Sequence, residues 1–556
     1  MDHNLGSLSR VTLGVKASGR GRVNERSMRF PMLLAALMLL AGCSLRPVLP
    51  ARDRLQIVQT QDFPTLDPIF VSGVGGQELA ALLYSYLVKI DDRGRLVPDA
   101  AEAVPSRENG GISPDGRTIT YRLRPDVRFA DGSRVTSFDV AETIGRIAFP
   151  GSDVPTRVAY DDVEAVTTPD SRTVRVLLRQ PYAPIVLYLC GPGNATPILP
   201  WRVIHEHAHL RGTSLDDAPL GSGPYMVRRW QRGDRLELVP NPYYYAGPAH
   251  ISALSIRIVS SATTALQMLR SGEADAYVNA DDAQYDDLRA LAATRTEMVP
   301  IDGTGALIFN TRDPRLSDAR VRRAIVSALD IRSIVSKSLL GERRDQDPGR
   351  GLFQWAYDPK AYAMPRFDLR AAQRMLDLAG WHRGSDGVRR RGGVTLALDF
   401  LVRADKPSAL IMATQMQAEA KAAGVSIAIR ELAIGEFVAP NGPLYGGRFQ
   451  VALFPFVNGF DPDVRDQFGC YRIPPHGFNK PRYCNPRLNP LMAAAVVPYD
   501  RASRTTLYHK VESMLAQDLP MAALYQAVSI NTFPAALQNE HAAVTTPFWN
   551  VGDWTF

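Results

Sequence analysis

Lysine, cysteine and long apolar segments are all scarce in this chain of 556 residues. Lysine supplies eight of the 64 basic residues, so arginine carries most of the positive charge. Four cysteines are too few for a disulfide scaffold of this length. The one long apolar run covers about residues 32–42, whereas a helix that spans a bilayer needs about 20 residues. These shortages exclude a disulfide-built fold and a polytopic membrane protein.

The chain nevertheless has the composition of a folded protein. Hydrophobic residues make up 45% and charged residues 22% of the sequence, a balance that excludes a disordered chain. Because domains average roughly 150 residues, a chain of this length should form two or three lobes. Its formal net charge of +7 raises the question of a nucleic-acid partner, which depends on where the charge lies.

The first 43 residues have the composition of an export signal. Residues 1–30 contain six basic and two acidic residues, and an apolar segment follows up to residue 42. The sequence Leu40-Ala-Gly-Cys43 resembles a bacterial lipobox, whose cysteine is acylated and becomes the first mature residue. We therefore expect residues 1–43 to form a signal peptide with a lipobox. The alternatives are an ordinary signal peptide with a chance cysteine and a start at Met28, which still leaves a complete short signal.

Removal of this leader also removes much of the excess positive charge. Without residues 1–42 the formal net charge falls from +7 to +3. The mature sequence has no dense stripe of lysine and arginine with interleaved aromatic residues, which nucleic-acid binding would require. Nucleic acid is therefore not an expected partner.

Apolar periodicity predicts a mixture of strands and helices along the mature chain. Strand-like patterns cover residues 55–58, 118–123, 173–178, 236–239, 254–258, 394–402 and 425–429. Helical spacing covers residues 77–88, 261–270, 412–423 and 503–517, and a further helix begins near Ser317. No repeat of fixed length is present, so we expect an α/β or α+β chain with several layers.

The helix near Ser317 separates into an apolar and a basic face. The apolar stripe consists of Val321, Ile325 and Leu329. The basic positions are Arg320, Arg322 and Arg323. We expect these arginines on a solvated or ion-paired face rather than at a ligand.

No arrangement of residues indicates an enzyme, a metal site or a cofactor. His205, His207 and His209 would share a face only in a strand, and we expect them to be surface histidines. The segment Gly221-Ser-Gly-Pro-Tyr225 lacks the Lys-Ser/Thr end of a phosphate-binding loop. No nucleophile elbow with a downstream acid and histidine is found. We therefore expect no catalytic residue, metal ligand or cofactor.

Cys470 and Cys484 are the candidates for a disulfide. They lack cysteine or histidine partners at zinc-ligand spacing, and an exported protein meets an oxidising compartment. A bond between them would close a loop of about 15 residues, worth about 3 kcal/mol in the chain-entropy model. The alternative is two unpaired buried thiols. Cys190 lies in an apolar stretch and is expected in the core.

Several blocks of the mature chain resemble the family 5 extracellular solute-binding proteins, the peptide/nickel type that serves ABC importers. The most recognisable block is Tyr121-Arg-Leu-Arg-Pro-Asp-Val-Arg-Phe-Ala-Asp-Gly-Ser-Arg-Val-Thr-Ser-Phe-Asp-Val140. The other blocks cover residues 66–68, 76–87, 219–225, 241–244, 271–275, 309–330, 380–381 and 461–463. One block alone would be weak evidence for the family. Together, however, the blocks follow the order found in the family over about residues 55–530.

The resemblance implies an α/β, two-lobed periplasmic-binding-protein fold of type II, with an extra subdomain inserted in lobe I. Lobe I would take residues 52–95, 220–300 and 525–556, with the inserted subdomain at 96–219. Lobe II would take residues 301–524. The chain would then cross between the lobes near residues 301 and 524, and a crossing pair of strands is a natural hinge.

In this family the ligand lies between the lobes, and the resemblance carries three regions over to this chain. The loop whose backbone borders the ligand corresponds to Ser72, Gly73 and Val74. The lobe I wall and the crossover correspond to Asn279, Thr304 and Gly305. The lobe II segment that faces the cleft corresponds to Phe456, Asn458, Gly459, Phe460 and Asp461.

Asn458 departs from the pattern of the peptide-binding members. These have an aspartate three positions before the Asp-Pro pair, and it captures the α-amino group of the peptide. An ion pair shielded inside a closed cleft is stronger than one in water, but asparagine brings no charge. Either Asp461 substitutes for the missing carboxylate, or the ligand lacks a cationic end.

The resemblance implies a lipid-anchored solute-binding protein of the periplasm or cell surface. It would capture an oligopeptide or peptide-like solute and deliver it to the permease subunits of an ABC transporter, with no bond broken. It would act as a monomer held to the membrane through Cys43. The alternatives are the same fold binding a sugar, opine or metal chelate, a ligand-sensing module, and a hydrolase acting on the captured peptide.

Overall fold

The computed structural model describes residues 53–556 other than 72–73, 208, 340–347 and 458–459. The expected leader, with Cys43, lies outside the described residues. The strands are β1 (Arg54–Gln59), β2 (Val88–Ile90), β3 (Leu96–Pro98), β4 (Thr118–Arg122), β5 (Val163–Asp170), β6 (Thr173–Leu178), β7 (Tyr225–Gln231), β8 (Arg235–Pro240), β9 (Ala253–Ile258), β10 (Ala276–Tyr277), β11 (Thr294–Phe309), β12 (His382–Arg383), β13 (Arg389–Arg391), β14 (Val394–Thr395), β15 (Ala397–Arg403), β16 (Ser426–Leu432), β17 (Val451–Val457) and β18 (Met521–Pro534). The helices are α1 (Val74–Leu83), α2 (Ser137–Ala148), α3 (Ile185–Tyr188), α4 (Trp201–Ile204), α5 (Ala262–Ser271), α6 (Tyr285–Arg289), α7 (Ala319–Ser327), α8 (Ile331–Ser338), α9 (Arg350–Phe353), α10 (Leu369–Leu378), α11 (Pro407–Ala423), α12 (Ile434–Phe437), α13 (Arg465–Phe468), α14 (Leu488–Ala495) and α15 (Arg501–Asp518).

A ten-stranded sheet has the order β16-β15-β17-β11-β18-β10-β1-β9-β8-β7. We call the part built on β1 and β7–β10 lobe I, and the part built on β15–β17 lobe II. Parallel strands need a crossover connection, and helices provide it: α5 leads from β9 to β10, which lie on either side of β1, and α11 leads from β15 to its neighbour β16. The segment between β3 and β7, which we call the inserted subdomain, carries a separate antiparallel sheet, β4-β6-β5, and helix α2.

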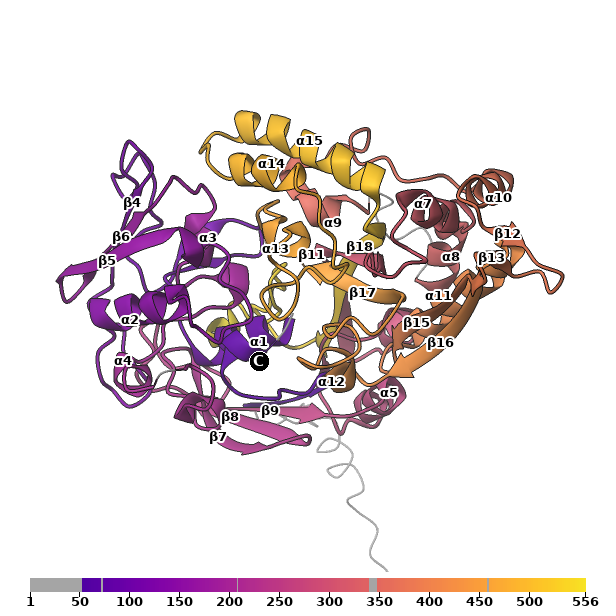
Figure 1. Ribbon diagram of the computed structural model, residues 1–556. Helices are drawn as coiled ribbons and strands as arrows, with labels where there is room; N and C mark the ends of the chain where they lie inside the picture. The colour runs from indigo at the N-terminus through magenta and orange to yellow at the C-terminus, as the bar shows by residue number, and fades with distance from the viewer. Residues whose placement is uncertain (1–52, 72–73, 208, 340–347, 458–459) are drawn as a thin grey trace, which may run out of the picture. The chain divides into compact units, whose positions relative to one another are not determined.

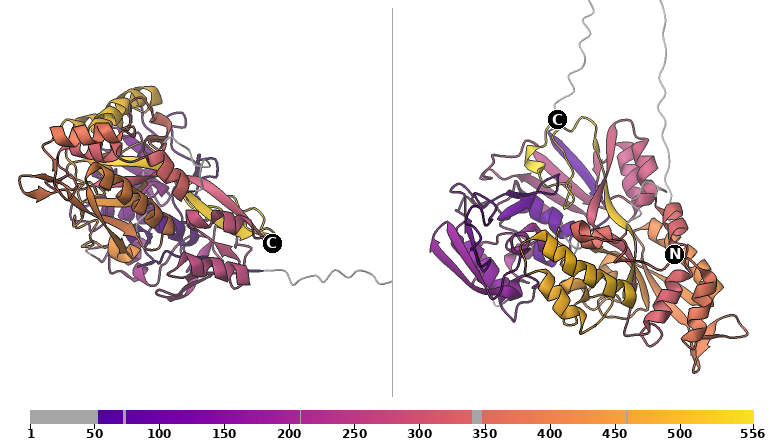
Figure 2. Two further views of the ribbon diagram at one scale, coloured as in Figure 1. Left: turned by 90° about the vertical axis from the view of Figure 1, so that its right-hand side faces the viewer. Right: turned by 90° about the horizontal axis from the view of Figure 1, so that it is seen from above.

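The long strands β11 and β18 join the two lobes. They pair with each other in antiparallel register from Thr294–Pro534 to Ile308–Met521, and β11 also pairs with β17. In Figure 1 they lie between the indigo-to-magenta elements of lobe I and the orange strands of lobe II, and Figure 2 shows them from the side and from above. Their ladder is interrupted between Pro300 and Thr304 and again between Gly305 and Ala306.

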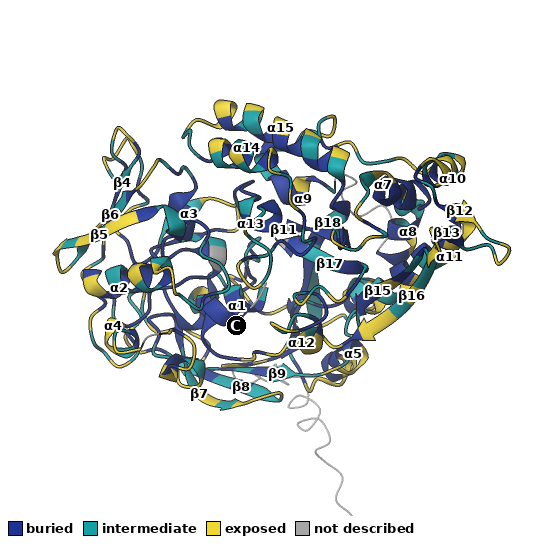
Figure 3. Cartoon of the chain, viewed as in Figure 1, coloured by how far each residue is buried: buried dark blue, intermediate teal, exposed yellow. Residues whose placement is uncertain are grey.

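The inner strands of the lobe II sheet are buried on both faces, whereas the edge strand β16 is partly exposed. Along β11, Leu307 and Phe309 belong to one hydrophobic cluster, and Ala306 and Ile308 belong to another. Successive side chains of a strand point to opposite faces, so one strand contributes to both clusters. Helices α7, α8, α10 and α11 pack on the first cluster, and α9, α14 and α15 pack on the second. Dark blue in Figure 3 marks the buried second half of β11 and most of β18.

Several helix ends agree with the sequence prediction, and others differ from it. Ser261 caps α5, and Gly272 closes it in the left-handed conformation with φ of 76°. The cap of α7 is Asp318 rather than Ser317, because the Asp318 side chain accepts from the Arg320 backbone N–H. Helix α1 begins three residues earlier and ends five residues earlier than the predicted 77–88.

Arg322 corrects the expectation of a solvated or ion-paired face on α7. Its side chain is buried, and Nε donates to the Leu519 carbonyl over 2.9 Å. Nη1 donates to the carbonyl of Leu316 over 2.6 Å. The arginine therefore ties α7 to the turn that precedes β18, a contact between distant segments that periodicity does not reveal. Arg320, by contrast, forms the expected ion pair with Asp318.

Candidate ligand-binding cleft

A cavity of about 250 Å³, which we call the central cavity, lies where β11, β17 and β18 meet the loops of lobe I. Lobe I contributes Gln61 after β1, Val74 at the start of α1, and Asn279 after β10. Lobe II contributes β17 and the first turn of α11, including Ala409. Because its walls come from both lobes, a movement of one lobe against the other would open or close it.

Aromatic rings form much of the lobe II wall. Phe456 is fully buried and stacks on Phe468, with ring centroids 6.0 Å apart. Phe454 stacks on Phe437 with centroids 5.3 Å apart. The Phe456 ring thus packs against the core and also lines the cavity. An apolar wall of this kind can pack against an apolar part of a small ligand.

The charged side chains that line the central cavity are mostly cationic. They are Asp282, Arg403, Lys406 and Lys480. Arg403 forms an ion pair with Asp405 over 2.5 Å. The Nζ of Lys406 donates to the backbone carbonyls of Asn279 and Ala280, each over 3.3 Å, and so joins α11 to lobe I. Lys480 instead lies among aromatic rings.

Asn279 belongs to a buried polar network in the lobe I wall. Its φ of 53° is in the left-handed region, which asparagine tolerates better than most residues. Its Nδ2 donates to Glu78 Oε1 over 2.5 Å, and its Oδ1 accepts from Ser529 Oγ over 3.0 Å. Burial raises the pKa of Glu78 to about 7, although the Asn279 hydrogen bond opposes this shift. The network orients Asn279 at the cavity by linking α1, β10 and β18.

Part of the expected ligand site lies at the cavity and part lies behind it. The expected residues that line it are Val74, Asn279 and Phe456. Thr304 is buried, and its Oγ1 donates to the Tyr525 carbonyl over 3.0 Å. Gly305 lies so close to Tyr525 that a Cβ there would overlap the ring. Because Tyr525 lines the cavity, Thr304 and Gly305 position a wall residue in this structure.

Asp461 and Phe460 do not line the central cavity in this structure. Both carboxylate oxygens of Asp461 accept from Arg504, over 2.8 and 2.5 Å, and both residues are buried. Phe460 packs against the hydrophobic cluster that lobe I shares with the inserted subdomain. A ligand role for either residue stays a prediction. Four of the expected residues lie outside the described chain: Ser72, Gly73, Asn458 and Gly459.

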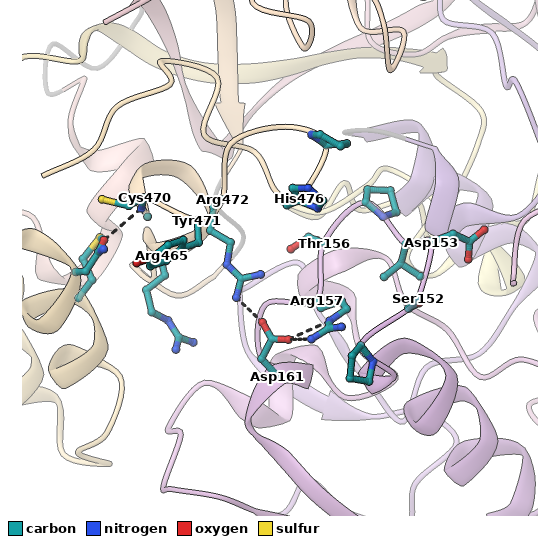
Figure 4. A pocket seen from close by; sticks show the side chains of 17 residues that line it. Ser152, Asp153, Thr156, Arg157, Asp161, Arg465, Cys470, Tyr471, Arg472 and His476 are labelled. Atoms are coloured by element: carbon teal, nitrogen blue, oxygen red, sulfur yellow. Dashed lines mark hydrogen bonds and ion pairs between the residues drawn. The ribbon is translucent and has the colours of Figure 1, made fainter. Parts of the chain in front are cut away.

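A second cavity, of about 660 Å³, lies between the inserted subdomain and lobe II, and we call it the peripheral cavity. Figure 4 shows Arg472 and Arg157 converging on Asp161 at its edge, with Arg472 Nη2 2.5 Å from Oδ2. Arg465 pairs with Asp463 and, over 3.5 Å, with Asp162 of the inserted subdomain. All three arginines that line this cavity are therefore paired with carboxylates.

The choice between the two cavities depends on their walls. The peripheral cavity is larger, but its arginines are neutralised by protein carboxylates. The central cavity combines aromatic surface, the crossing strands and a cationic group without a carboxylate partner among the described residues. Pockets that combine apolar walls with a few polar groups are typical ligand sites, so we take the central cavity as the candidate site.

A disulfide links Cys470 and Cys484, whose Cα atoms lie 4.5 Å apart. It closes the segment that carries Phe478 and Lys480 into the central cavity. Cys190 is a buried free thiol, and burial raises its pKa. Within the described ranges, no three potential ligands gather in a way that could hold a metal ion, and no helix is long and apolar enough to cross a bilayer.

Sequence reasoning missed Lys480, Tyr525 and Ser529 as cavity residues. Lys480 had a usable signal, because it is the one lysine between the two cysteines in a chain where lysine is rare. Tyr525 and Ser529 had none, because they look like ordinary positions of an apolar strand. Their place at the cavity depends on the pairing of β18 with β11.

The middle of the chain matches a known family. Residues 95–467 match the sequence model of the bacterial extracellular solute-binding proteins, family 5 (middle region), which is more than half of the chain. The chain belongs to this family. Family 5 proteins bind solutes for transport and are not enzymes, and the two-lobed type II fold of periplasmic binding proteins accounts for the strands that cross between lobes.

Individual relatives extend this family match over most of the chain. The probable D,D-dipeptide-binding periplasmic protein DdpA of Escherichia coli (strain K12) is 26% identical over 514 residues, which cover 90% of this chain and 94% of DdpA. The oligopeptide-binding protein AppA of Bacillus subtilis in complex with a nonapeptide has a TM-score of 0.83 at 20% identity, covering 90% and 98% of the two chains. NikZ of Campylobacter jejuni with Ni(L-His) has a TM-score of 0.80 at 21% identity, covering 91% and 100%. At these identities the structural likeness shows the fold alone.

Proposed function

We propose that this family 5 protein captures a peptide or peptide-like solute in the central cavity and delivers it to the permease subunits of an ABC transporter. The observation that carries the proposal is a cavity walled by both lobes beside the strands that join them. The peptides named for DdpA and AppA support the solute class. A volume of about 250 Å³ lies below the roughly 300–1,000 Å³ typical of small-molecule sites, which favours a solute of dipeptide size.

Capture would proceed by closure of the lobes about β11 and β18. The interruption between Pro300 and Thr304 leaves a stretch of the ladder that can bend without breaking paired hydrogen bonds. Closure removes the solute from water, which strengthens the polar interactions made inside the cavity. The free energy of binding favours the closed state, and no bond of the solute is broken.

The protein would act outside the cytoplasm, as a monomer in the periplasm or at the cell surface. The lipobox-like sequence ending at Cys43 supports a lipid anchor. One acyl chain holds a protein to a membrane only weakly, so stable anchoring requires that Cys43 receive more than one. A non-peptide solute is the second candidate, because Asn458 replaces the aspartate of peptide-binding members and NikZ, of the same fold, holds Ni(L-His).

Thermal denaturation with defined peptide pools tests the proposal. A ligand that binds only the folded chain raises its stability by about 2.7 kcal/mol at a hundred times its Kd. We expect a pool of dipeptides to raise the Tm of the purified protein and to be recovered intact. If pools of dipeptides, tripeptides and longer peptides all leave the Tm unchanged, the peptide proposal is wrong. Recovery of cleaved peptides would contradict a carrier.

A further inference from the structure

Lys480 is a buried ammonium group enclosed by three aromatic rings. It lies between the two bonded cysteines and is 6% exposed. Its Nζ lies 4.5 Å from the ring centroid of Phe456, 5.1 Å from that of Phe454 and 5.8 Å from that of Phe478. All four residues line the central cavity. Ring faces attract a cation, so the cage holds the ammonium group in place.

Among the described residues, no carboxylate forms an ion pair with the ammonium group of Lys480. Within the described part of the chain, Nζ makes no hydrogen bond, and no carboxylate comes within ion-pair distance. Burial lowers the pKa of Lys480 to about 8, and the more distant Asp466 opposes that shift, so the group is still largely protonated at pH 7. An unpaired buried charge is costly, and proteins rarely keep one without a partner.

The other charges at the cavity do not supply that partner. Arg403 is paired with Asp405, and Lys406 is bonded to backbone carbonyls of lobe I. Asp282 is the single carboxylate among the lining residues, and it stands on the lobe I side. The lobe II wall therefore presents a fixed positive charge to whatever enters the cavity.

We propose that Lys480 is the counterion for an anionic group of the bound solute, of which a carboxylate is the simplest case. The solute would place its carboxylate on the Nζ of Lys480 and its apolar part against Phe454 and Phe456. The ion pair would form in a site from which closure excludes water, where it is stronger than in solution. This inference rests on the proposed solute-binding function and narrows its solute class to acids.

Binding of matched acid and amide probes tests the inference. The probes are a pool of dipeptides with free carboxylates and the same pool as dipeptide amides, with affinities measured by calorimetry. We expect the wild-type chain to bind the acids on the order of ten- to a hundredfold more tightly than the amides. Lys480→Met should remove this preference, because it keeps the length and apolar character of the side chain but not its charge. Lys480→Arg should retain part of the preference.

Lys510→Met is the matched control, because Lys510 is an exposed lysine on α15. It should bind both pools like the wild type. Equal binding of acids and amides by the wild type would overturn the inference and leave the peptide proposal standing. A preference for acids that persists in Lys480→Met would also overturn the inference and leave the peptide proposal standing.

Failure of both dipeptide pools to bind would instead contradict a solute of dipeptide size. The same comparison is then made with N-carboxyethyl amino acids and their methyl esters. A preference for the acids that depends on Lys480 would support the counterion role for a non-peptide solute. Equal binding, or none, would overturn that role as well.

Discussion

Glu78 is fully buried in α1, with one carboxylate oxygen bonded to Asn279 and the other without a hydrogen-bond partner in the described structure. Burial raises its pKa from 4.5 to about 7. Between these values the folded chain holds a proton that the unfolded chain has lost. The free energy of unfolding therefore decreases as the pH rises from about 4.5 to 7, by up to about 3 kcal/mol from this group.

Glu78→Gln should remove this decrease. The amide stays neutral at every pH, so the variant should gain stability relative to the wild type between pH 5 and pH 8. Thermal denaturation of both proteins at the two pH values measures the difference in stability. The contributions of the other buried carboxyl groups to the pH dependence are the same in both proteins and cancel in the comparison. Glu436→Gln is the control, because Glu436 is exposed. Parallel pH profiles for Glu78→Gln and the wild type would show that Glu78 is ionised in the folded chain at pH 5.

At the residue scale, the family resemblance located part of the candidate site. The residues Val74, Asn279 and Phe456 were expected at the ligand and line the central cavity. The hydrogen bond from Asn279 to Glu78 was not foreseeable, because it joins residues 201 positions apart. The cage around Lys480 was missed for the same reason: its rings come from β17 and the disulfide-closed segment.

At the scale of elements, the crossing of β11 and β18 depends on Gly305. A side chain at this position would overlap the ring of Tyr525, which lines the central cavity. Gly305→Ala should therefore destabilise the protein by about 1–3 kcal/mol, as overpacking does, and should weaken solute binding by displacing Tyr525. Urea denaturation and calorimetry with the best-binding pool measure the two effects.

Gly145→Ala is the control for that substitution. Gly145 is exposed in α2, and a Cβ there meets nothing within 4 Å. Alanine should stabilise the helix by about 0.5–1 kcal/mol and leave solute binding unchanged. Equal stability and affinity of Gly305→Ala and the wild type would mean that Tyr525 has no fixed place in the cavity wall.

Local sequence patterns predicted most elements that depend on local physics. Alternation located β6 at 173–178, and helical spacing over 261–270 located α5 to within one residue at each end. The cap of α7 was misplaced by one residue, because Ser317 and Asp318 are both good caps. The order of the ten strands and the interruption at 300–304 depend on contacts between distant segments, which periodicity does not encode.

At the scale of the whole molecule, two lobes share one sheet, and the chain crosses between them through β11 and β18. Lys406 joins α11 to lobe I, and Arg465 and Arg472 join lobe II to the inserted subdomain. These contacts bring the lobes together around the central cavity in this conformation. Solute binding should favour this conformation over more open ones, because the solute would contact both walls at once.

Native mass spectrometry of the protein purified without unfolding tests the central claim, that a solute binds between the lobes. The wild-type chain should carry one small molecule per monomer. Ala409→Trp, which fills the central cavity from the first turn of α11, should lose it. Thr414→Trp, on the exposed face of the same helix, should retain it. A wild-type chain without a bound molecule, or one whose occupancy is the same in Ala409→Trp, would contradict binding in this cavity.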